Sequence, residues 1–297
     1  MTSDAVTMPA DLRRWLTDHL PDITAATDAS WPRTQSRVWR LTTRTSTAYV
    51  KLSPSAQSYT RETSAYRHAA AALDPDRAPQ LIATDPALRA ILTTALAGKV
   101  VRDLPLAPEA EAKVHKLAGR VLRRWHDHLA PVPPQARDNL TAALAGQAAE
   151  ATACLDSLGG HLTEHEQILV REVARDLPAM AADLPLVYLH GDFSPRNWVW
   201  NPQTQTLGLI DFEMADHALA VQDMVWLFGA VWPTRPDLRA SFLTGYGGEP
   251  TTLEQRALLL LTTRLAVSYL SAGLATNDQV LIDRGHNALG ALVRAHA

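Results

Sequence analysis

The stretch 186–212 most constrains what this chain can fold into, because it interrupts a mostly helical region with β-type apolar runs that flank two polar clusters. The first cluster contains Asp192 and Asn197, and Asp211 directly follows the second apolar run. If the apolar runs pair as a β-hairpin, these three oxygen-bearing side chains converge. No cysteine or histidine cluster lies nearby, and hard oxygen ligands suit Mg²⁺ better than zinc.

Phosphoryl transfer requires this set of groups. An aspartate must orient the acceptor hydroxyl and take its proton, while an amide and a second carboxylate hold Mg²⁺ on a triphosphate. The spacing H-x-D-x-x-x-x-N followed by D-F-x is the catalytic arrangement of eukaryotic protein kinases. The chain matches it with His190, Asp192 and Asn197, and then with Asp211-Phe-Glu. We therefore interpret the stretch as a phosphoryl-transfer site rather than a polar surface turn.

The N-terminal third provides an independent test of this interpretation. A kinase needs a lysine on a strand for the α- and β-phosphates and a helical glutamate to orient that lysine. Lys51 lies in the strand-like run 48–52 and is the only lysine among the first 98 residues. Glu62 follows 11 residues later, within the predicted helix 57–73. In a sequence so poor in lysine, this placement favours a phosphate ligand over a solvated surface lysine.

The composition excludes several other classes of protein. With 46% hydrophobic and 20% charged residues, the 297-residue chain has the composition of a soluble globular protein. A net charge of -3 argues against a nucleic-acid protein that binds through bulk positive charge. The single cysteine, Cys154, excludes a disulfide-stapled scaffold. All 14 glycines lie at Gly98 or later, so the N-terminal third has no phosphate-binding loop built from several glycines.

The hydrophobic patterns predict two parts with different secondary structure. The N-terminal part is expected to contain two helices, a β-hairpin and two further short strands. The helices are 9–20 and 57–73, the hairpin is Ser36–Thr42 with Ala48–Leu52, and the further strands are Gln80–Thr84 and Arg89–Thr94. After Gly98 the chain is expected to be mostly helical, over 108–129, 136–156, 162–182, 218–232, 236–245 and 253–272. The patterns therefore predict a β-rich lobe followed by a helical lobe with one embedded hairpin.

These motifs resemble those of the aminoglycoside phosphotransferase family, which comprises small-molecule kinases with a protein-kinase-like fold. The resemblance rests on His190-Gly-Asp-Phe-Ser-Pro-Arg-Asn197 and Ile210-Asp-Phe-Glu213. It extends to Tyr49-Val-Lys-Leu52 with Glu62, to the turn Leu96-Ala-Gly98, and to the helix Leu117–His126. Gly191 stands where protein kinases have arginine, which favours a small-molecule kinase.

The resemblance implies an α+β, protein-kinase-like fold of two lobes. Residues 1–95 would form the small β-rich lobe that binds the nucleotide. Residues 96–297 would form the larger, mainly helical lobe with the catalytic hairpin and the acceptor site.

The resemblance also implies a role for each matching residue of the reaction centre. Asp192 would be the catalytic base, and Asn197 and Asp211 would bind Mg²⁺. Lys51 would bind the nucleotide phosphates, and Glu62 would pair with Lys51.

The nucleotide would make further contacts outside that centre. Thr94 to Leu96 would form the hinge, whose backbone groups meet the nucleotide base. Relatives often have glycine or serine in the loop that covers the phosphates, whereas residues 31–37 of this chain contain no glycine. Gln35 and Ser36 would supply side-chain donors there, since a backbone without glycine approaches a phosphate less closely.

Other polar residues are expected to support the site or the core. The resemblance implies that His190 supports the loop rather than reacts, and that Asp223 braces this loop from a buried helix. His115, His126 and His128 fall on one amphipathic helix without a cysteine or carboxylate at ligand spacing. We expect these three to be surface or packing residues rather than metal ligands.

The leading function is then an ATP- or GTP-dependent kinase that phosphorylates a hydroxyl of a small molecule, such as an aminoglycoside or another antibiotic. A metabolic acceptor such as choline, homoserine or a sugar is the alternative within the same mechanism. A kinase-fold binding module without activity is the third reading, and the unusual loop is its only support. An acidic N-terminus and a longest aliphatic run of only 257–261 predict a cytoplasmic protein that binds neither membrane nor nucleic acid.

Overall fold

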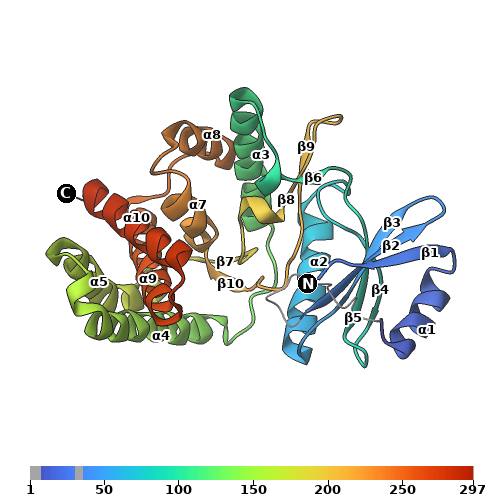
Figure 1. The fold of residues 1–297 in the computed structure, drawn as a ribbon, viewed down its shortest axis with the longest axis horizontal. Helices are drawn as coiled ribbons and strands as arrows, with labels where there is room; N and C mark the ends of the chain where they lie inside the picture. Colours follow the sequence, from blue (N-terminus) through green and yellow to red (C-terminus); the bar gives the residue numbers. More distant parts are fainter. Residues whose placement is uncertain (1–7, 31–35, 297) are drawn as a thin grey trace. The chain divides into compact units, whose positions relative to one another are not determined.

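The computed structural model describes residues 8–30 and 36–296 and divides into two compact units (Figure 1). The first unit combines Met1–Leu104 with Pro195–Ala215, and the second combines Pro105–Ser194 with Asp216–Ala297. The first is built on antiparallel sheets and the second mainly on helices, as the α+β prediction requires. The functional division between residues 95 and 96 stays a prediction.

The main sheet of the first unit has five antiparallel strands in the order β1-β2-β3-β5-β4. The strands are β1 (Ile23–Asp28), β2 (Arg37–Thr43), β3 (Thr47–Leu52), β4 (Leu81–Asp85) and β5 (Ala90–Thr94). The predicted hairpin is confirmed as the β2–β3 pair, in which Val38 lies opposite Lys51. Ala48 and Val50 are buried in the core, so the two-residue alternation of a strand directs Lys51 to the other face of the sheet.

Two helices accompany this sheet. Helix α1 (Ala10–His19) buries Leu12 and Leu16 against Trp39 and other apolar residues of the strands. Helix α2 (Ala56–Ala72) begins after Ser55, whose side chain accepts a hydrogen bond from the Ser58 N–H at 3.0 Å. Such a cap satisfies one of the free N–H groups of the first turn and fixes where the helix starts.

A second, three-stranded sheet of the first unit has the order β6-β8-β9. Its strands are β6 (Lys99–Val100), β8 (Trp198–Asn201) and β9 (Thr206–Leu209). The turn before β6 requires glycine: Gly98 has φ +130°, and a Cβ there would meet the carbonyl oxygen of Trp200. The β8–β9 hairpin places Asp211 two residues beyond its last strand.

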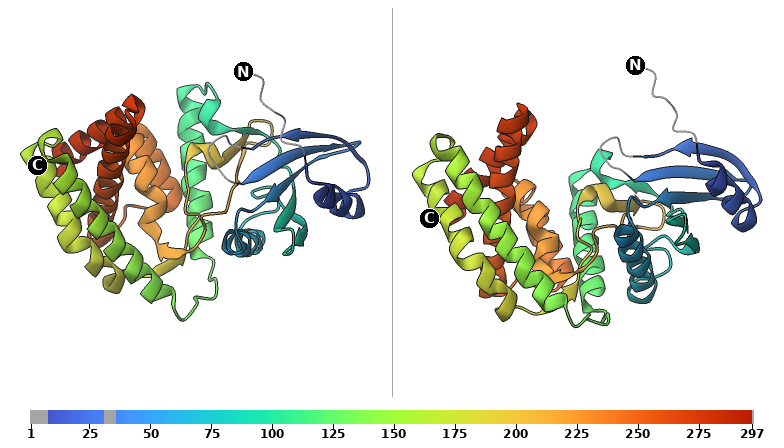
Figure 2. Two further views of the ribbon diagram at one scale, coloured as in Figure 1. Left: turned by 60° about the horizontal axis from the view of Figure 1, so that its bottom comes forward. Right: turned by 90° about the horizontal axis from the view of Figure 1, so that it is seen from below.

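The second unit consists mainly of helices (Figure 2). They are α3 (Pro108–Asp127), α4 (Ala136–Leu158), α5 (Glu164–Asp176), α6 (Met180–Asp183), α7 (Val225–Ala230), α8 (Pro236–Tyr246), α9 (Thr252–Thr276) and α10 (Gln279–His296). Helices α3 and α8 cross at two glycines, because a Cβ at Gly119 or Gly245 would meet a backbone carbonyl of the other helix. Close crossing of this kind is available only to residues without a side chain.

Several elements differ from the sequence-based expectation. The helix predicted over 162–182 is interrupted around Pro178, where a 3-10 turn (Leu177–Ala179) separates α5 from α6. The helix predicted over 218–232 begins instead as β10 (His217–Leu219), which pairs with β7 (Leu186–Tyr188), and continues through a 3-10 helix (Ala220–Met224) into α7. Strand β1 and helix α10 were not predicted.

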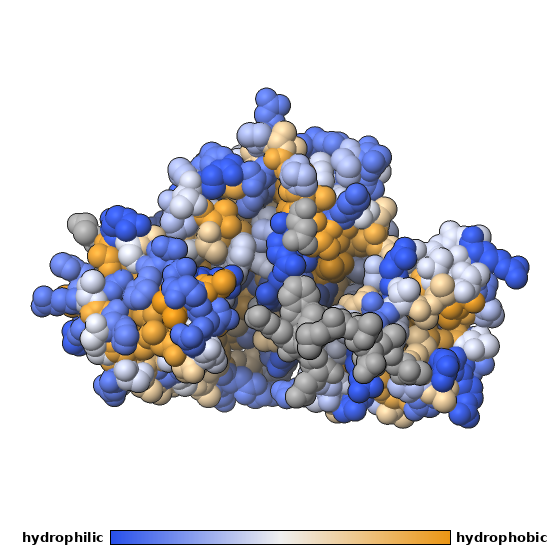
Figure 3. All heavy atoms as spheres, viewed as in Figure 1, coloured by the Kyte–Doolittle hydropathy of each residue, from blue (hydrophilic) through white to orange (hydrophobic). Residues whose placement is uncertain are grey.

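The surface is mixed in polarity, and one helix is both long and apolar. On the face drawn in Figure 3, hydrophobic residues form patches between hydrophilic ones on both units. Among the described residues, α9 alone is long and apolar enough to cross a membrane by length and composition. In the structure 56% of its apolar window is buried, as in the core helix of a globular protein.

Candidate active site

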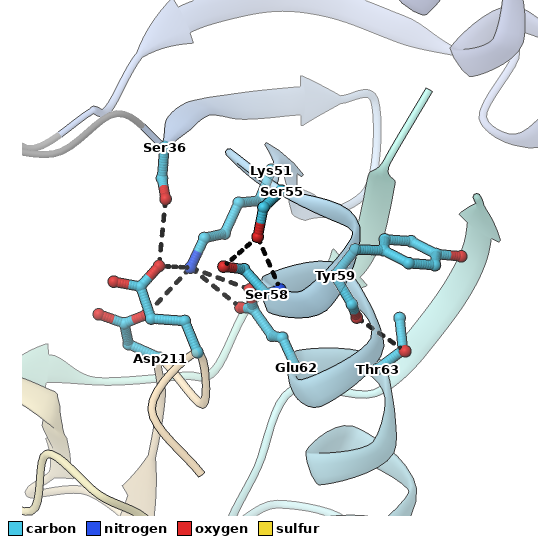
Figure 4. A network of polar contacts seen from close by, with 9 residues as sticks. Ser36, Lys51, Ser55, Ser58, Tyr59, Glu62, Thr63 and Asp211 are labelled. Atoms are coloured by element: carbon cyan, nitrogen blue, oxygen red, sulfur yellow. Dashed lines mark hydrogen bonds and ion pairs between the residues drawn. The ribbon is translucent and has the colours of Figure 1, made fainter. Parts of the chain in front are cut away.

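The first unit brings Lys51 and Glu62 together, as the sequence predicted (Figure 4). Lys51 extends from β3, and Glu62 lies on the first half of α2. The Lys51 Nζ is 3.1 Å from Oε1 of Glu62 and 3.0 Å from its Oε2. The Glu62 side chain is only 1% exposed. Burial of this pair fixes the ammonium group at a defined place beside the sheet.

The segment after β9 contributes two more carboxylates to the same lysine. Lys51 Nζ lies 3.1 Å from Oδ1 of Asp211 and 2.7 Å from Oε2 of Glu213. Phe212 between them is fully buried and packs edge-on against Tyr66 of α2, with ring centroids 4.9 Å apart. This anchor explains how residues far apart in the sequence meet: Phe212 fixes the segment against the helix that carries Glu62.

The backbone of Asp211 adopts an uncommon conformation. Its φ is +65°, in the left-handed region that non-glycine residues rarely occupy. Aspartate tolerates this region better than most residues, yet the conformation still costs roughly 1–3 kcal/mol where the surroundings enforce it. Such conformations concentrate at functional sites, so the observation supports a functional assignment of Asp211.

The charges of this cluster are unbalanced. Burial disfavours the charged form of Lys51, but the carboxylates of Glu62, Asp211 and Glu213 outweigh burial and raise the pKa of Lys51 above its ordinary value. Burial raises the pKa of Glu62 to about 7, although the Lys51 ammonium acts in the opposite direction. Three carboxylates share one ammonium. The most deeply buried of them, Glu62, therefore stays protonated up to the highest pH.

A backbone hydrogen bond joins Asn197 to Ile210, the residue before Asp211. Asn197 ends a short 3-10 helix (Pro195–Asn197) and is buried, and its carbonyl oxygen accepts a hydrogen bond from the Ile210 N–H at 3.0 Å. The two predicted metal ligands, Asn197 and Asp211, thus belong to one unit, and this backbone hydrogen bond holds their two segments together. The Asp211 side chain is 41% exposed, which leaves its carboxylate accessible to a cation.

The side-chain oxygens of Asp211 and Asn197 suit a Mg²⁺ ion that is held partly by the protein and partly by substrate phosphates. Within residues 8–30 and 36–296, no group of three or more His, Cys, Asp or Glu side chains is arranged to hold a metal ion. Mg²⁺ usually keeps several waters and binds one or two carboxylates together with substrate phosphates. One carboxylate and one amide, from Asp211 and Asn197, match that pattern.

The other predicted nucleotide contacts have mixed outcomes. The Ser36 hydroxyl donates to Oε2 of Glu213 at 3.1 Å, whereas Gln35 lies outside the described residues. In the predicted hinge, the Thr94 and Ala95 N–H groups donate to backbone carbonyls of the sheet. The Leu96 side chain lies beside Gly208 of β9, where an added Cβ would meet its Cδ1. The contact of Thr94 to Leu96 with the nucleotide base stays a prediction.

Asp192 belongs to the second unit, within a loop that is held by buried groups. Its backbone N–H lies 3.3 Å from Nδ1 of His190, and His190 is fully buried. The Asp223 carboxylate, also fully buried, accepts hydrogen bonds from the N–H groups of His190 at 2.9 Å and Gly191 at 2.7 Å. Asp223 thus braces the loop, as expected, and buried His190 contacts its backbone. That His190 does not itself react stays a prediction.

Sequence reasoning missed two residues behind this loop. His126 of α3 places Nε2 3.0 Å from Asp223, and its Nδ1 lies 2.9 Å from the Tyr246 hydroxyl of α8. Because a carboxylate only accepts, the network assigns the imidazole proton to Nε2, and Nδ1 accepts from Tyr246. Burial raises the pKa of Tyr246, so its hydroxyl keeps the proton that it donates. We expected His126 to be a surface or packing residue, and its partners could not be predicted because they are distant in the sequence.

The units together define a class of protein. A five-stranded sheet with a lysine–glutamate pair, an Asp-Phe-Glu segment after a hairpin, and a mainly helical second unit form a protein-kinase-like fold. A family model described as the phosphotransferase enzyme family matches residues 26–259. The chain therefore belongs to this family, which confirms the resemblance drawn from the motifs.

Solved structures agree with this fold at low sequence identity. The GDP complex of an aminoglycoside 2'-phosphotransferase-IIIa has a TM-score of 0.67 at 16% identity, covering 97% of this chain and 99% of that one. The streptomycin–ATP ternary complex of APH(2")-IIa has a TM-score of 0.67 at 16% identity, covering 96% of each chain. An APH(9)-Ia spectinomycin phosphotransferase with ADP and spectinomycin has a TM-score of 0.61 at 14% identity, covering 97% and 93%. Among curated proteins, none matches this sequence.

Proposed function

We propose that this protein is a Mg²⁺-dependent kinase that transfers the γ-phosphoryl group of ATP or GTP to a hydroxyl of a small molecule. The assembly of Lys51, Glu62 and Asp211 carries this proposal, because three separate segments place both carboxylates within hydrogen-bonding distance of the Lys51 ammonium. An ordinary ion pair on the surface would need neither a buried glutamate such as Glu62 nor an aspartate with left-handed backbone dihedrals such as Asp211. Membership of the phosphotransferase enzyme family gives independent support.

Lys51 binds the α- and β-phosphates in the proposed reaction. Glu62 keeps the Lys51 ammonium in place, since the Glu62 side chain is almost completely buried and has little freedom to move. Asn197 and Asp211 would hold Mg²⁺, which would supply positive charge against the triphosphate. Ser36 contributes a hydroxyl donor at the start of β2.

Asp192 is the proposed general base. A base in this reaction orients the acceptor hydroxyl for in-line attack and takes its proton as the new bond forms. The Asp192 side chain is half-buried, and the loop that carries it is fixed through two backbone N–H groups by Asp223. A fixed loop keeps the carboxylate in one orientation, which a positioning role demands.

The acceptor class is proposed from the relatives. Solved structures with this fold hold aminoglycosides or spectinomycin in complexes, among them a gentamicin complex at 16% identity. We propose an aminoglycoside or another antibiotic as the acceptor, with resistance or self-protection as the biological role. The cytoplasmic location expected from the sequence stays a prediction.

A nucleoside-diphosphate release assay tests this function directly. The protein is mixed with Mg²⁺, ATP or GTP, and one compound at a time from a panel of aminoglycosides, spectinomycin, macrolides, choline, homoserine and sugars. We expect diphosphate release above the acceptor-free rate with at least one antibiotic, and mass spectrometry of that product should show one added phosphate. Turnover only with a metabolic acceptor would contradict the antibiotic assignment. Absence of nucleotide binding as well as turnover would contradict the kinase itself.

A further inference from the structure

Glu213 accepts hydrogen bonds from two groups, the Lys51 ammonium and the Ser36 hydroxyl, that the proposed function assigns to the nucleotide phosphates. Its Oε2 lies 2.7 Å from the Lys51 Nζ and accepts the Ser36 hydroxyl hydrogen bond at 3.1 Å. The Glu213 contact is the shortest of the lysine's three carboxylate contacts. One carboxylate oxygen thus joins the start of β2 to the lysine of β3. An anionic oxygen in this position has the same charge and acceptor character as a phosphate oxygen.

The three carboxylates differ in how easily each can leave Lys51 and be hydrated by water instead. The exposed fraction of the side chain is 1% for Glu62, 25% for Glu213 and 41% for Asp211. Separating Glu62 from its partner would leave a charge in a buried environment, which is costly. Glu213 can leave Lys51 and gain hydration instead. Of the two glutamates, Glu213 is therefore the one that an incoming ligand displaces.

The charge of the cluster determines what form of ligand can displace it. Asp211 and Glu213 alone bring two negative charges to one ammonium, and an ionised Glu62 adds a third, so the cluster carries an excess of negative charge. A nucleotide without a metal brings further negative charge to the same place, and like charges at such distances repel. A divalent cation that arrives with the nucleotide offsets this excess. The arrangement favours the metal complex of the nucleotide over the free nucleotide.

We propose that Glu213 holds Lys51 and Ser36 when no nucleotide is bound and must release both for phosphates to bind, so that the site selects the metal–nucleotide complex. This inference rests on the proposed function and adds a specificity role for a residue outside the predicted catalytic set. Glu213 acts by competing with phosphate for Lys51 and Ser36. Phe212, buried against Tyr66, keeps the backbone of the segment in place while the side chain moves.

Binding of ADP measured by calorimetry tests this role without turnover. The wild-type protein and Glu213→Gln are each titrated with ADP, once with excess Mg²⁺ and once with EDTA. Removal of the competing charge should tighten the binding of free ADP by roughly tenfold. Mg²⁺-ADP displaces the same carboxylate but brings its own cation, so its binding should tighten less, and the ratio of the dissociation constants in EDTA and in Mg²⁺ should fall. Glu213→Ala should do the same, because it also removes the acceptor oxygens.

Glu249→Gln is the matched control, since Glu249 pairs with Arg239 in the second unit. This variant should bind ADP as the wild type does under both conditions. The inference is overturned if Glu213→Gln, folded by circular dichroism, binds free ADP no tighter than the wild type. Weaker binding of Mg²⁺-ADP with unchanged binding of free ADP would also overturn it and make Glu213 a metal ligand only. Failure of the wild type to bind Mg²⁺-ADP would instead contradict the proposed function.

Discussion

The Nε2 of His126 donates a hydrogen bond to the carboxylate of Asp223 across 3.0 Å, and both side chains are buried. Asp223 in turn accepts the backbone N–H groups at the start of the loop that carries Asp192. Helix α3 and the 3-10 helix before α7 are thereby tied to one loop. His126 and Asp223 act through that loop, so both are positioning residues.

The first prediction concerns the charge at Asp223. Asp223→Asn should reduce kcat by roughly 10- to 100-fold, because the amide presents N–H groups where three donors already converge. It should also lower the free energy of unfolding by about 3 kcal/mol. The Kd for Mg²⁺-ADP should stay within about twofold of wild type, because Lys51 lies in the other unit. Asp237→Asn, at an exposed helix start, is the control. A large loss of nucleotide affinity with unchanged kcat would contradict the positioning role.

A second prediction uses the glycines of the helices. Gly245→Ala should destabilise the protein by roughly 2–4 kcal/mol, because the added Cβ would meet the backbone carbonyl of Lys116 where α3 and α8 cross. Gly146→Ala is the matched control, since the interior of α4 offers open space around Gly146. It should stabilise the protein by about 0.5–1 kcal/mol through helix propensity. Equal effects of the two substitutions in urea unfolding would show that the crossing is not close packed.

The third prediction follows from the proton affinity of Glu62. Burial raises its pKa from the ordinary 4.5 to about 7, so the folded protein binds a proton that the unfolded chain has released. The stabilisation from that proton is complete below about pH 4.5 and is lost as the pH rises through about 7. The Glu62→Gln variant, which mimics the protonated form, should therefore gain stability relative to wild type between pH 5 and pH 8.

The measurement is the unfolding of wild type and Glu62→Gln at several pH values without Mg²⁺ or nucleotide. The difference in the free energy of unfolding should change by on the order of 1–3 kcal/mol across this range. Parallel pH profiles for the two proteins would contradict the raised pKa. Glu164→Gln, on the exposed first turn of α5, provides a control that should leave the profile unchanged.

Much of the first unit could be predicted because its signals are local. The alternation around Lys51 and the helical pattern around Glu62 depend on neighbouring residues, and chemistry predicts that the two side chains pair. The contact between Glu213 and Ser36 could not be predicted in this way. It joins positions 177 residues apart and depends on the packing of Phe212 against Tyr66.

In the second unit, sequence patterns predicted neither the pairing of the two short strands nor the hydrogen bonds of His126. Strands β7 and β10 have only three residues each, too few to show a period, and they pair across an intervening hairpin. His126 lies on the buried face of an amphipathic helix, and its helical period is that of a packing residue. Its hydrogen bonds to Asp223 and Tyr246 arise only from the crossing of α3 with α8 and from the 3-10 turn.

The most direct test of the whole account is transfer of radioactive phosphate from [γ-³²P]ATP or [γ-³²P]GTP to the best acceptor of the panel, by wild type and by Asp192→Asn. We predict that the variant folds with an unchanged melting temperature and binds Mg²⁺-ADP normally, and that its kcat falls by at least roughly 100-fold, because it lacks the base. A variant that transfers phosphate at nearly the wild-type rate would contradict the assignment of Asp192 and with it the proposed mechanism.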